Sequence, residues 1–550
     1  MNTLILDIET NMKHDTIWCC VTKRTDTGKV QVHTSPDTLR PLVQYADRIV
    51  GHNIIGFDGP VLRRVWDVAL PVRKIRDSLI LSRLLNPVLE GGHSLRAWGK
   101  RLGNYKDDFS DYDGGLSDEM VSYCKQDVEV THTLLSFLNA ELKQWKNAKQ
   151  AIELEHLVAI ECAKQEKNGF KLDVPSAQVL HATMQDRMSG IEEQMQQVFL
   201  PIVEERWSEK TGKRLKDNVI TFNPGSRQQI AMRLQQLGWK PQKFTEKGQI
   251  IVDETTLESV ELEEAQLIAE YLMLQKRVGL IDSWLKNADE TTHRVHGRII
   301  TNGAVTGRMT HHSPNMGQIP SVTKPYGEEC RKLWTVDGGN VLVGSDLAGI
   351  ELRCLAHYMG DEEWTKELLN GDIHTKNQKA AGLDTRAQAK TFIYATLYGA
   401  GASKIGLIVG GGAKEGNELL EAFYRNTPKL AALMQKVQNY AEKGYVPGLD
   451  GRRIQVRSSH AALNTLLQGC GAIVAKQWCV EMHREFRKNK LDVKQVAFVH
   501  DEIQVEAKEA DAEQTAQIMV EAAASAGETL GFRCPVDAEA KIGANWYETH

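Results

Sequence analysis

Short apolar runs alternate with longer amphipathic stretches over the first 140 residues, a pattern that predicts strands and helices in one α/β unit. The run Thr3–Thr10 (TLILDIET) is almost continuously apolar, as is typical of a central strand buried on both faces. The segments Thr16–Lys23 and Lys29–Thr34 predict two further strands, and a long helix is predicted from Ser117.

The middle of the chain is predominantly helical in its pattern. Helical periodicity runs from Glu141 to about Arg206, and the polar stretch Arg206–Lys216 interrupts it. Ser226 is predicted to cap the next helix, and a further helical run covers Asp253–Arg277. A strand is predicted over His296–Thr301. The lysine and arginine clusters here suit a DNA backbone, although such charge runs are more often solvated helix faces.

Two strands in the last third of the chain each end at an aspartate. The apolar strand from Val341 ends at Asp346, and a predicted helix containing Glu351 follows. The segment Val496–Glu506 reads as a strand, a tight turn and a second strand, with Asp501 at the bend. Carboxylates at the ends of two strands can meet in one sheet and share divalent cations.

The segment Arg386–Gly399 (RAQAKTFIYATLYG) predicts a helix with two cations and two phenols spaced four residues apart, namely Arg386, Lys390, Tyr394 and Tyr398. At about 3.6 residues per turn these side chains share one ridge, while small and apolar residues occupy the other side. Cations along a helix suit a row of phosphates, and an aromatic ring further along offers a stacking surface for a base. A solvated basic face with two half-buried tyrosines is the alternative interpretation.

Composition narrows the class of protein. The 550 residues predict three to five domain-sized units, without repeats or low-complexity tracts. Membrane-length apolar runs and a signal or transit peptide are absent from the sequence, and the nine cysteines form no CxxC pair, so reduced thiols in the cytoplasm are expected. The net charge of −5 means that binding a polyanion requires locally concentrated lysine and arginine.

Acidic residues in the first unit predict a metal site. Asp7 and Glu9 interrupt the first strand and, with a period of two, lie on the same face. Asp58 precedes a helical segment, and Tyr123 and Asp127 lie four apart on one helix face. Two buried carboxylates repel each other unless a cation sits between them. Each acid alone is more often a surface residue or a helix cap, as Asp58 could be.

These motifs (DIE, HNxxxFD and YxxxD) resemble those of the DEDD-type 3′→5′ proofreading exonuclease domain, tyrosine subclass. The resemblance implies an RNase H-like fold in which two Mg²⁺ ions are held by Asp7, Glu9, Asp58 and Asp127. Tyr123 would position the attacking water. His93, in GGHSLRAWG, either contacts the nucleic acid backbone or has a structural role at a helix start.

The remaining motifs resemble motifs A, B and C of family A DNA polymerases, with the nearest match among short phage replicative enzymes. The likeness also covers TNGAVTGRMTH, LNTLLQG, VHDEIQV and the final NWYETH, and therefore nearly the whole chain. It implies a right-hand architecture beside the exonuclease, with these units: exonuclease 1–140, thumb 141–295, palm 296–360 and 466–550, and fingers 361–465.

The family resemblance also implies roles for single residues. Asp346 and Asp501 would bind two Mg²⁺ ions, with the backbone carbonyl of Leu347 as a further ligand. His374, Arg386 and Lys390 would hold the incoming triphosphate, and Lys390 would protonate the pyrophosphate. The residues beside the sugar and the templating base would be Glu351, Tyr394 and Tyr398, with Glu351 excluding a ribose 2′-hydroxyl. The residues at the primer end and minor groove would be Arg308, Asn315, Gln318, Asn464, Gln468 and His500. Gly317 departs from the glutamine common in the family.

Expected partners are primer-template DNA and deoxynucleoside triphosphates, with a replicative helicase or primase as candidate protein partners and a monomeric state. Because few residues precede Asp7, we expect neither the 5′-nuclease domain of bacterial repair relatives nor primer removal by this chain. Some phage relatives carry a thumb insertion that recruits thioredoxin, and the interval Arg206–Asn223 is too short for it. Processivity is therefore expected to be low or to come from another partner.

Two other functions are compatible with parts of this sequence. A single-subunit RNA polymerase shares the palm and motif B, but Glu351, Tyr394 and an attached DNA exonuclease disfavour it. A nuclease whose C-terminal half only binds DNA would require Asp346 or Asp501 to be lost, and both are present.

Overall fold

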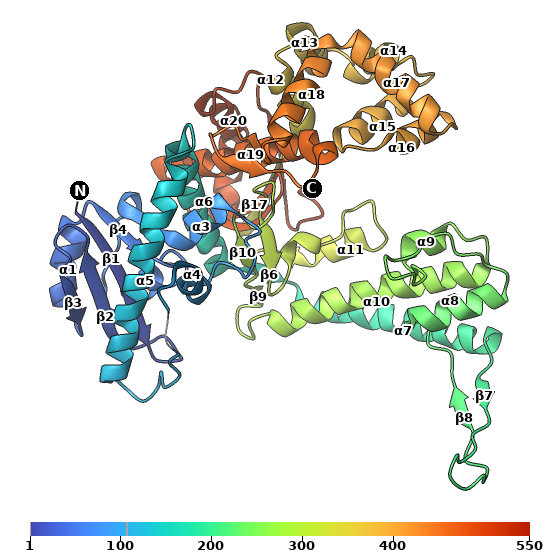
Figure 1. The fold of residues 1–550 in the computed structure, drawn as a ribbon, viewed down its shortest axis with the longest axis horizontal. Coiled ribbons are helices and arrows are strands. Elements are labelled where there is room, and N and C mark those ends of the chain that lie inside the picture. The colour runs from blue at the N-terminus through green and yellow to red at the C-terminus, as the bar shows by residue number, and fades with distance from the viewer. Residues whose placement is uncertain (1, 106–107) are drawn as a thin grey trace.

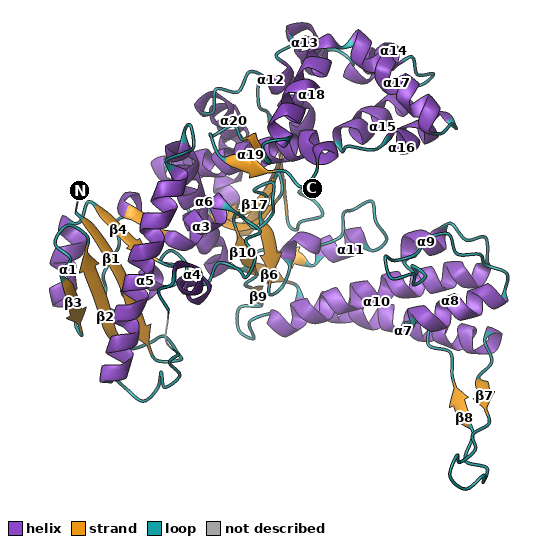
Figure 2. Ribbon diagram, viewed as in Figure 1, coloured by secondary structure: helices purple, strands orange, loops and turns teal. Residues whose placement is uncertain are grey.

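The computed structural model describes residues 2–105 and 108–550, and it confirms an α/β protein of several units (Figure 1). Strands form the N-terminal sheet, the central sheets and a protruding hairpin, whereas residues 350–441 contain only helices (Figure 2). In the described parts of the chain, every helix is too short or too polar to cross a lipid bilayer.

A five-stranded sheet with the order β3-β2-β1-β4-β5 forms the N-terminal unit. Its strands are β1 (Thr3–Thr10), β2 (Ile17–Arg24), β3 (Val30–His33), β4 (Arg48–Gly51) and β5 (Ile75–Asp77), which confirms the three predicted strands. Its helices are α1 (Pro36–Tyr45), α2 (Asp58–Val65), α3 (Ser78–Leu85), α4 (Leu95–Leu102) and α5 (Asp118–Leu142). Leu4 and Leu6 of β1 enter the core on one face of the sheet, and Ile5 enters the core that contains α5. Asp7 and Glu9 share the parity of Ile5 and therefore face α5.

The middle of the chain forms a long helical arm that carries a hairpin (Figure 1). Before the arm come α6 (Ala148–Asn168) and β6 (Phe170–Leu172), and the arm itself contains α7 (Val174–Val198), β7 (Ile202–Glu204), β8 (Asn218–Ile220), α8 (Arg227–Gln236), α9 (Glu254–Glu258) and α10 (Glu263–Asn287). Helices α7 and α10 pack side by side. Between them, the Arg187 guanidinium donates two hydrogen bonds of 2.7 Å to the Glu270 carboxylate. Ser226 caps α8, as predicted.

Two predicted helical runs are wrong in their extent. The run from Glu141 to Arg206 is broken by β6, which pairs with β12 (Trp334–Thr335) and β9 (Arg294–Val295) in a three-stranded sheet. Gly169, with φ +62°, makes this break. The run Asp253–Arg277 is two helices, and the second continues to Asn287. For β6, pairing with strands far along the chain decides the local structure.

A four-stranded antiparallel sheet with the order β16-β17-β13-β18 lies at the centre of the C-terminal half. Its strands are β13 (Asn340–Leu347), β16 (Lys494–Val499), β17 (Glu502–Lys508) and β18 (Ala538–Gly543). The smaller strands of this half are β10 (Arg298–Ile300), β11 (Thr310–His312), β14 (Tyr445–Pro447) and β15 (Arg453–Gln455).

One large core joins this sheet to the surrounding helices. The helices of the C-terminal half are α11 (Gly327–Lys332), α12 (Ile350–Met359), α13 (Glu362–Asn370), α14 (Ile373–Ala381), α15 (Arg386–Leu397), α16 (Ala402–Gly406), α17 (Ala413–Asn426), α18 (Pro428–Ala441), α19 (Ala462–Lys488) and α20 (Ala512–Thr529). All nine cysteines of the chain are buried and free of disulfides.

Candidate active sites

Asp346 and Asp501 meet at one end of the C-terminal sheet. Asp346 is paired across the β13–β17 ladder with Glu502, and the Leu347 N–H donates to the Asp501 carbonyl at 3.1 Å. The predicted strand ends therefore converge, because β13 and the β16–β17 turn are neighbours in one sheet.

The electrostatics of this pair are unfavourable without a cation. The surrounding protein, which limits hydration, and then the Asp501 and Glu502 carboxylates raise the pKa of Asp346 to about 7. Burial also raises the pKa of Asp501, while the charges of Arg308 and His500 oppose that shift. Two hard oxygen ligands whose pKa values are both raised are a donor set suited to Mg²⁺.

Glu502 already has protein partners. Its carboxylate accepts hydrogen bonds from Gln504 (2.8 Å) and from the Trp546 indole, and His550 lies at 3.1 Å. Burial acts to raise the pKa of Glu502, but the partners, His550 first, hold it below its ordinary value. Glu502 therefore differs from the two aspartates in its pKa, which is lowered while theirs are raised.

Helix α15 presents the predicted ridge of cations and phenols. A capping box of Thr385 and Gln388 begins the helix, and Ala389 and Phe392 are fully buried on its other side. Lys390 is exposed, and the Arg386 guanidinium donates to Asp372 at 2.7 Å. This confirms the predicted helix and the separation of its two faces.

His374 and the two tyrosines stand along the same side. The His374 and Tyr394 rings have centroids 6.3 Å apart, and the Tyr394 and Tyr398 rings are stacked at 6.5 Å. Burial and then the charges of Arg386 and Lys390 lower the pKa of His374. His374 is therefore neutral near pH 7, because its ordinary pKa is already about 6.5.

Glu351 connects α15 to the aspartates. The Tyr398 hydroxyl lies 2.7 and 2.8 Å from the two Glu351 oxygens, and the Arg308 guanidinium lies 3.8 Å from one of them. Burial and then the hydrogen bond with Glu351 raise the pKa of Tyr398 to about 12. The expectation paired Glu351 with Tyr394 beside the sugar, whereas the direct hydrogen bond in the structure is with Tyr398.

Apart from Arg308, which lies beside Glu351, the residues predicted for the primer side are spread over three places. Asn464 and Gln468 lie half-buried, one turn apart, on α19, and His500 sits in the β16–β17 turn with φ +59°. Asn315 and Gln318 belong to the segment after β11, where the Asn315 side chain accepts the Gly317 N–H at 3.0 Å. His311, which the sequence did not single out, contacts the Phe498 carbonyl at 2.9 Å beside this segment.

A second acidic site lies on the N-terminal sheet. The five predicted residues line one cavity of about 290 Å³: Asp7, Glu9, Asp58, Tyr123 and Asp127. The cavity brings together β1, the start of α2 and one face of α5. It is also lined by residues that the sequence did not single out: His14, His52, Asn53, Phe57 and Tyr112. Of these, His52, Asn53 and Phe57 lie inside the HNxxxFD motif.

Asp58 is part of the acidic site, and its alternative interpretation as a helix cap is wrong, because Phe57 occupies the N-cap position of α2. The Asp58 carboxylate instead accepts the Ile8 N–H at 3.2 Å. Burial and then Asp77 and Asp127 raise the pKa of Asp58 to about 7. His93 contacts Ser82 (2.7 Å) and the Pro87 carbonyl (3.3 Å), which favours its structural interpretation.

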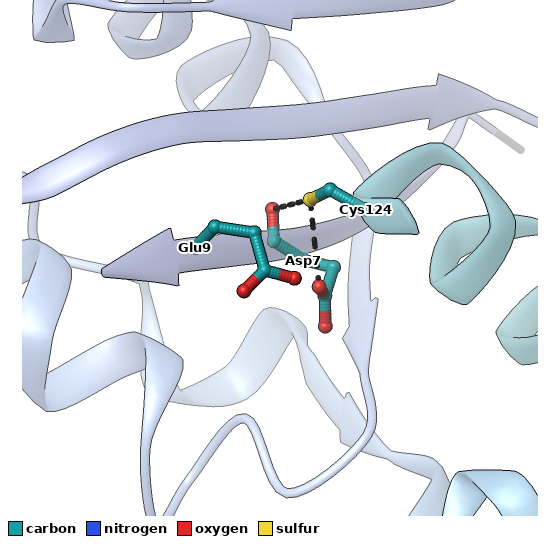
Figure 3. A group of neighbouring side chains, drawn as sticks. All are labelled: Asp7, Glu9 and Cys124. Carbon is teal, nitrogen blue, oxygen red and sulfur yellow. Dashed lines mark hydrogen bonds between the residues drawn. The ribbon is translucent and has the colours of Figure 1, made fainter. Parts of the chain in front are cut away.

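Cys124 is an unforeseen neighbour of the acidic pair (Figure 3). Its thiol lies 3.5 Å from both the Asp7 carbonyl and an Asp7 carboxylate oxygen. One ligand atom from each of Asp7, Glu9 and Cys124 falls within 4.8 Å of the others. Burial raises the pKa of Cys124 well above its ordinary value, so this thiol acts as a weak hydrogen-bond donor to Asp7.

The comparison with known proteins assigns the family. A family profile described as DNA polymerase family A matches residues 191–548. A DNA-directed DNA polymerase of Enterobacteria phage T3 is 35% identical over 665 aligned positions that cover 94% of this chain and 94% of the phage protein. The chain belongs to DNA polymerase family A.

Further similar proteins agree with this family assignment. A DNA-directed DNA polymerase of Escherichia phage T7 gives the same identity and coverage. Since the aligned stretch of 665 positions exceeds the 550 residues of this polymerase, both phage proteins carry segments that it lacks. The fold is shared with the POL domain of Pol1 from M. smegmatis, solved as a complex with DNA primer-template and dNTP. That comparison gives a TM-score of 0.81 at 18% identity and covers 99% of this chain and 95% of that chain.

Proposed function

We propose that this chain extends the 3′ end of a DNA primer by template-directed nucleotidyl transfer at Asp346 and Asp501. The observation that carries the proposal is the convergence of these aspartates at one end of the C-terminal sheet, with α15 connected to them through Tyr398, Glu351 and Arg308. Phosphoryl transfer depends chiefly on positioning and on neutralising charge, and this arrangement supplies carboxylates and cations for both.

The donor set at the aspartates fits divalent cations, because the Asp501 and Glu502 carboxylates disfavour ionisation of Asp346 and a cation would offset this repulsion. We assign the ligands to Asp346, Asp501 and the Leu347 carbonyl. Two Mg²⁺ ions bound there would lower the pKa of the primer 3′-hydroxyl and hold the triphosphate oxygens.

The side chains around the aspartates then have separate roles. Arg386 and Lys390 hold the triphosphate, His374 contributes a neutral hydrogen-bonding group, and Lys390 gives a proton to the leaving pyrophosphate. Tyr394 lies beside the sugar, and Tyr398 lies near the templating base. Glu351 blocks a 2′-hydroxyl on the incoming nucleotide. The primer end and minor groove are contacted by Arg308, Asn315, Gln318, Asn464, Gln468 and His500.

A 3′→5′ exonuclease activity is proposed for the N-terminal cavity. Its four carboxylates come from β1, α2 and α5, and they fit two cations because Asp58 is buried among other acids. Two Mg²⁺ ions bound there would activate water and stabilise the leaving oxygen. Tyr123 orients that water, and Cys124 helps to hold Asp7 in place.

For the domains we propose the division that the resemblance to family A DNA polymerases implies. We assign residues 1–140 to the exonuclease, 141–295 to the thumb, 296–360 and 466–550 to the palm, and 361–465 to the fingers. The M. smegmatis POL domain was solved with DNA primer-template and dNTP, which supports the same ligands for this chain. We propose that it acts as a monomer in the cytoplasm, that of the host if a phage encodes it, with a replicative helicase or primase as partners.

A primer-extension assay tests the proposal. Purified protein with Mg²⁺ and a primed template should add deoxynucleotides and reject ribonucleotides. Without nucleotides it should shorten the primer from its 3′ end. Equal use of ribonucleotides would instead support an RNA polymerase, and degradation without extension would support a nuclease with a DNA-binding half.

A further inference from the structure

A buried cluster of charges joins α6, α19 and the loop between β14 and β15. The Lys476 ammonium and the Arg452 guanidinium both donate to the same Glu155 oxygen at 2.6 Å. Arg452 also donates to Asp450 through two nitrogens, with a shortest distance of 2.6 Å. Lys476, Glu155 and Arg452 expose only 1%, 0% and 3% of their side chains.

This cluster is poorly explained as a device for stability alone. Burying charged groups carries a desolvation penalty that the pairing often only balances, and apolar residues of similar size can do as well. Burial acts to lower the pKa of Lys476, which shows the same penalty. The cluster contains two cations and two carboxylates, so its charges balance. Its hydrogen bonds also fix the directions in which these side chains point. Buried polar networks of this kind can fix one geometry of a neighbouring segment.

The neighbouring segment is the loop that leads into Arg308. Lys476 donates a second hydrogen bond to the Gly307 carbonyl at 2.8 Å, and this carbonyl belongs to the peptide unit that joins Gly307 to Arg308. Gly307 has φ +79°, and a Cβ atom there would lie 3.2 Å from the Arg452 guanidinium. Lys476 therefore binds this peptide unit directly, and the Arg452 guanidinium lies beside the Cα of Gly307.

The other contacts of the loop hold it to rigid elements. The Thr306 carbonyl lies 3.2 Å from the Cβ position of Gly469, so the loop passes close to α19 next to Gln468. At the start of the loop, Asn302 donates to the Arg83 carbonyl at the end of α3 (2.9 Å). The loop is thus fixed at both ends before Arg308 extends toward Glu351 and Asp501.

We propose that Lys476, Glu155 and Arg452 are positioning residues that set the Arg308 guanidinium at the primer end. The proposal deepens the proposed function and rests on it, because there Arg308 contacts the primer. Lys476 and Arg452 touch neither substrate nor the reacting atoms in this arrangement. They act through the Gly307 peptide, and Glu155 holds both cations in place.

A double-mutant cycle tests this positioning role in the full-length protein. Lys476→Met, Arg308→Ala and the double variant are compared by single-nucleotide addition to a primed template with Mg²⁺ and by thermal melting. Lys476→Met should lower kcat/KM about tenfold, since small displacements of a positioned group are costly. In the Arg308→Ala background the same change should lower it less than about twofold. The melting temperature should fall equally in both backgrounds.

Another buried ion pair, between Arg294 and Glu506, provides the matched control. Arg294 pairs with Glu506 at 2.7 Å, with exposures of 9% and 1%, four residues along β17 from Glu502. Arg294→Met should also lower the melting temperature. Its effect on kcat/KM should multiply with that of Arg308→Ala, because it does not hold the Arg308 loop.

Each outcome decides the inference. If the effects of Lys476→Met and Arg308→Ala on kcat/KM multiply, the positioning role is overturned. It is also overturned if Arg308→Ala alone leaves primer extension intact. A wild-type protein that cannot extend a primer would overturn the proposed function, and the inference with it. If Lys476→Met does not fold, the isosteric Glu155→Gln replaces it in the same cycle with the same expected non-additivity.

Discussion

Asp346 is the residue on which synthesis should depend most directly. Asp346→Ala removes one of the two aspartates that meet at the end of the sheet. We expect primer extension to fall by about 10²–10³-fold or more, the size of effect caused by removing one charge-stabilising group from an active site. Extension and 3′-end degradation are measured on the same labelled primer. Degradation should be unchanged, and surviving extension would contradict the site assignment.

Removing carboxylates from the N-terminal cavity tests whether degradation is independent of synthesis. Asp7→Ala combined with Glu9→Ala removes both carboxylates of β1 from the N-terminal cavity. Degradation of a labelled primer should become undetectable, because cations can no longer be held there. Primer extension in the presence of nucleotides should persist at the wild-type rate. Loss of synthesis in this variant would show that the two sites are not independent.

Tyr394 should determine how chain-terminating nucleotides are used. Its hydroxyl can take the polar position left by a missing 3′-hydroxyl, so wild-type protein should accept dideoxynucleotides well. Tyr394→Phe should raise discrimination against them by about tenfold or more, the effect of losing one hydrogen bond in a closed site. Competition between dideoxy- and deoxynucleotides in primer extension gives the ratio. Strong discrimination by the wild type that Tyr394→Phe leaves unchanged would refute this role.

Single residues also show what the sequence could predict. Asp7, Glu9, Asp58, Asp346 and Asp501 lie in short motifs whose spacing implies a shared face or a strand end, and the structure groups them in two places. The hydrogen bond between Tyr398 and Glu351, the contact of Cys124 with Asp7 and the Lys476 cluster were not foreseeable. Each joins residues at least 47 positions apart, and local periodicity carries no information on such pairs.

At the scale of elements, the end of α15 should be sensitive to a single methyl group. Gly399 has φ +74°, and a Cβ atom there would lie 2.5 Å from the His460 carbonyl. Gly399→Ala should therefore destabilise the protein by more than about 1 kcal/mol. It should also raise the KM for nucleotides, because Tyr398 precedes this residue.

The neighbouring glycine provides the control for that change. Gly401 has φ −69°, and a Cβ atom there would have no neighbour within 4 Å. Gly401→Ala should leave both the unfolding midpoint in urea and the nucleotide KM unchanged. Equal behaviour of the two variants would show that the turn after α15 is not constrained.

Element boundaries were predictable where the local pattern was strong. The helix Arg386–Leu397 begins at a capping box and keeps one buried face, so its sequence alone identifies it. Strand β6 has three residues within a helical pattern, and it exists because β9 and β12 pair with it. Pairing partners more than 120 residues away override the weak local preference of so short a segment.

At the scale of the whole molecule, the β7–β8 hairpin should be dispensable for folding. Almost all residues from Val203 to Val219 are exposed. Strands β7 and β8 pack mainly on each other, and their contacts with the other described elements are fewer. Replacing residues 203–219 by a short Gly-Ser linker should change stability by no more than about 0.5 kcal/mol. Single-nucleotide addition should also be unchanged, and thermal melting with primer extension checks both. A clear loss of stability would show that the hairpin contributes to the core.

The order of strands in the C-terminal sheet has a consequence for how the protein is made. Strand β13, which carries Asp346, pairs only with β17 and β18 among the described strands, and both are synthesised more than 150 residues later. At about 5–20 residues per second, β13 leaves the ribosome many seconds before either neighbour exists. The N-terminal sheet, by contrast, has all its strands by Asp77. A nascent chain stalled before β17 should therefore hold a folded first unit together with an unpaired, aggregation-prone strand, a natural point for chaperone binding.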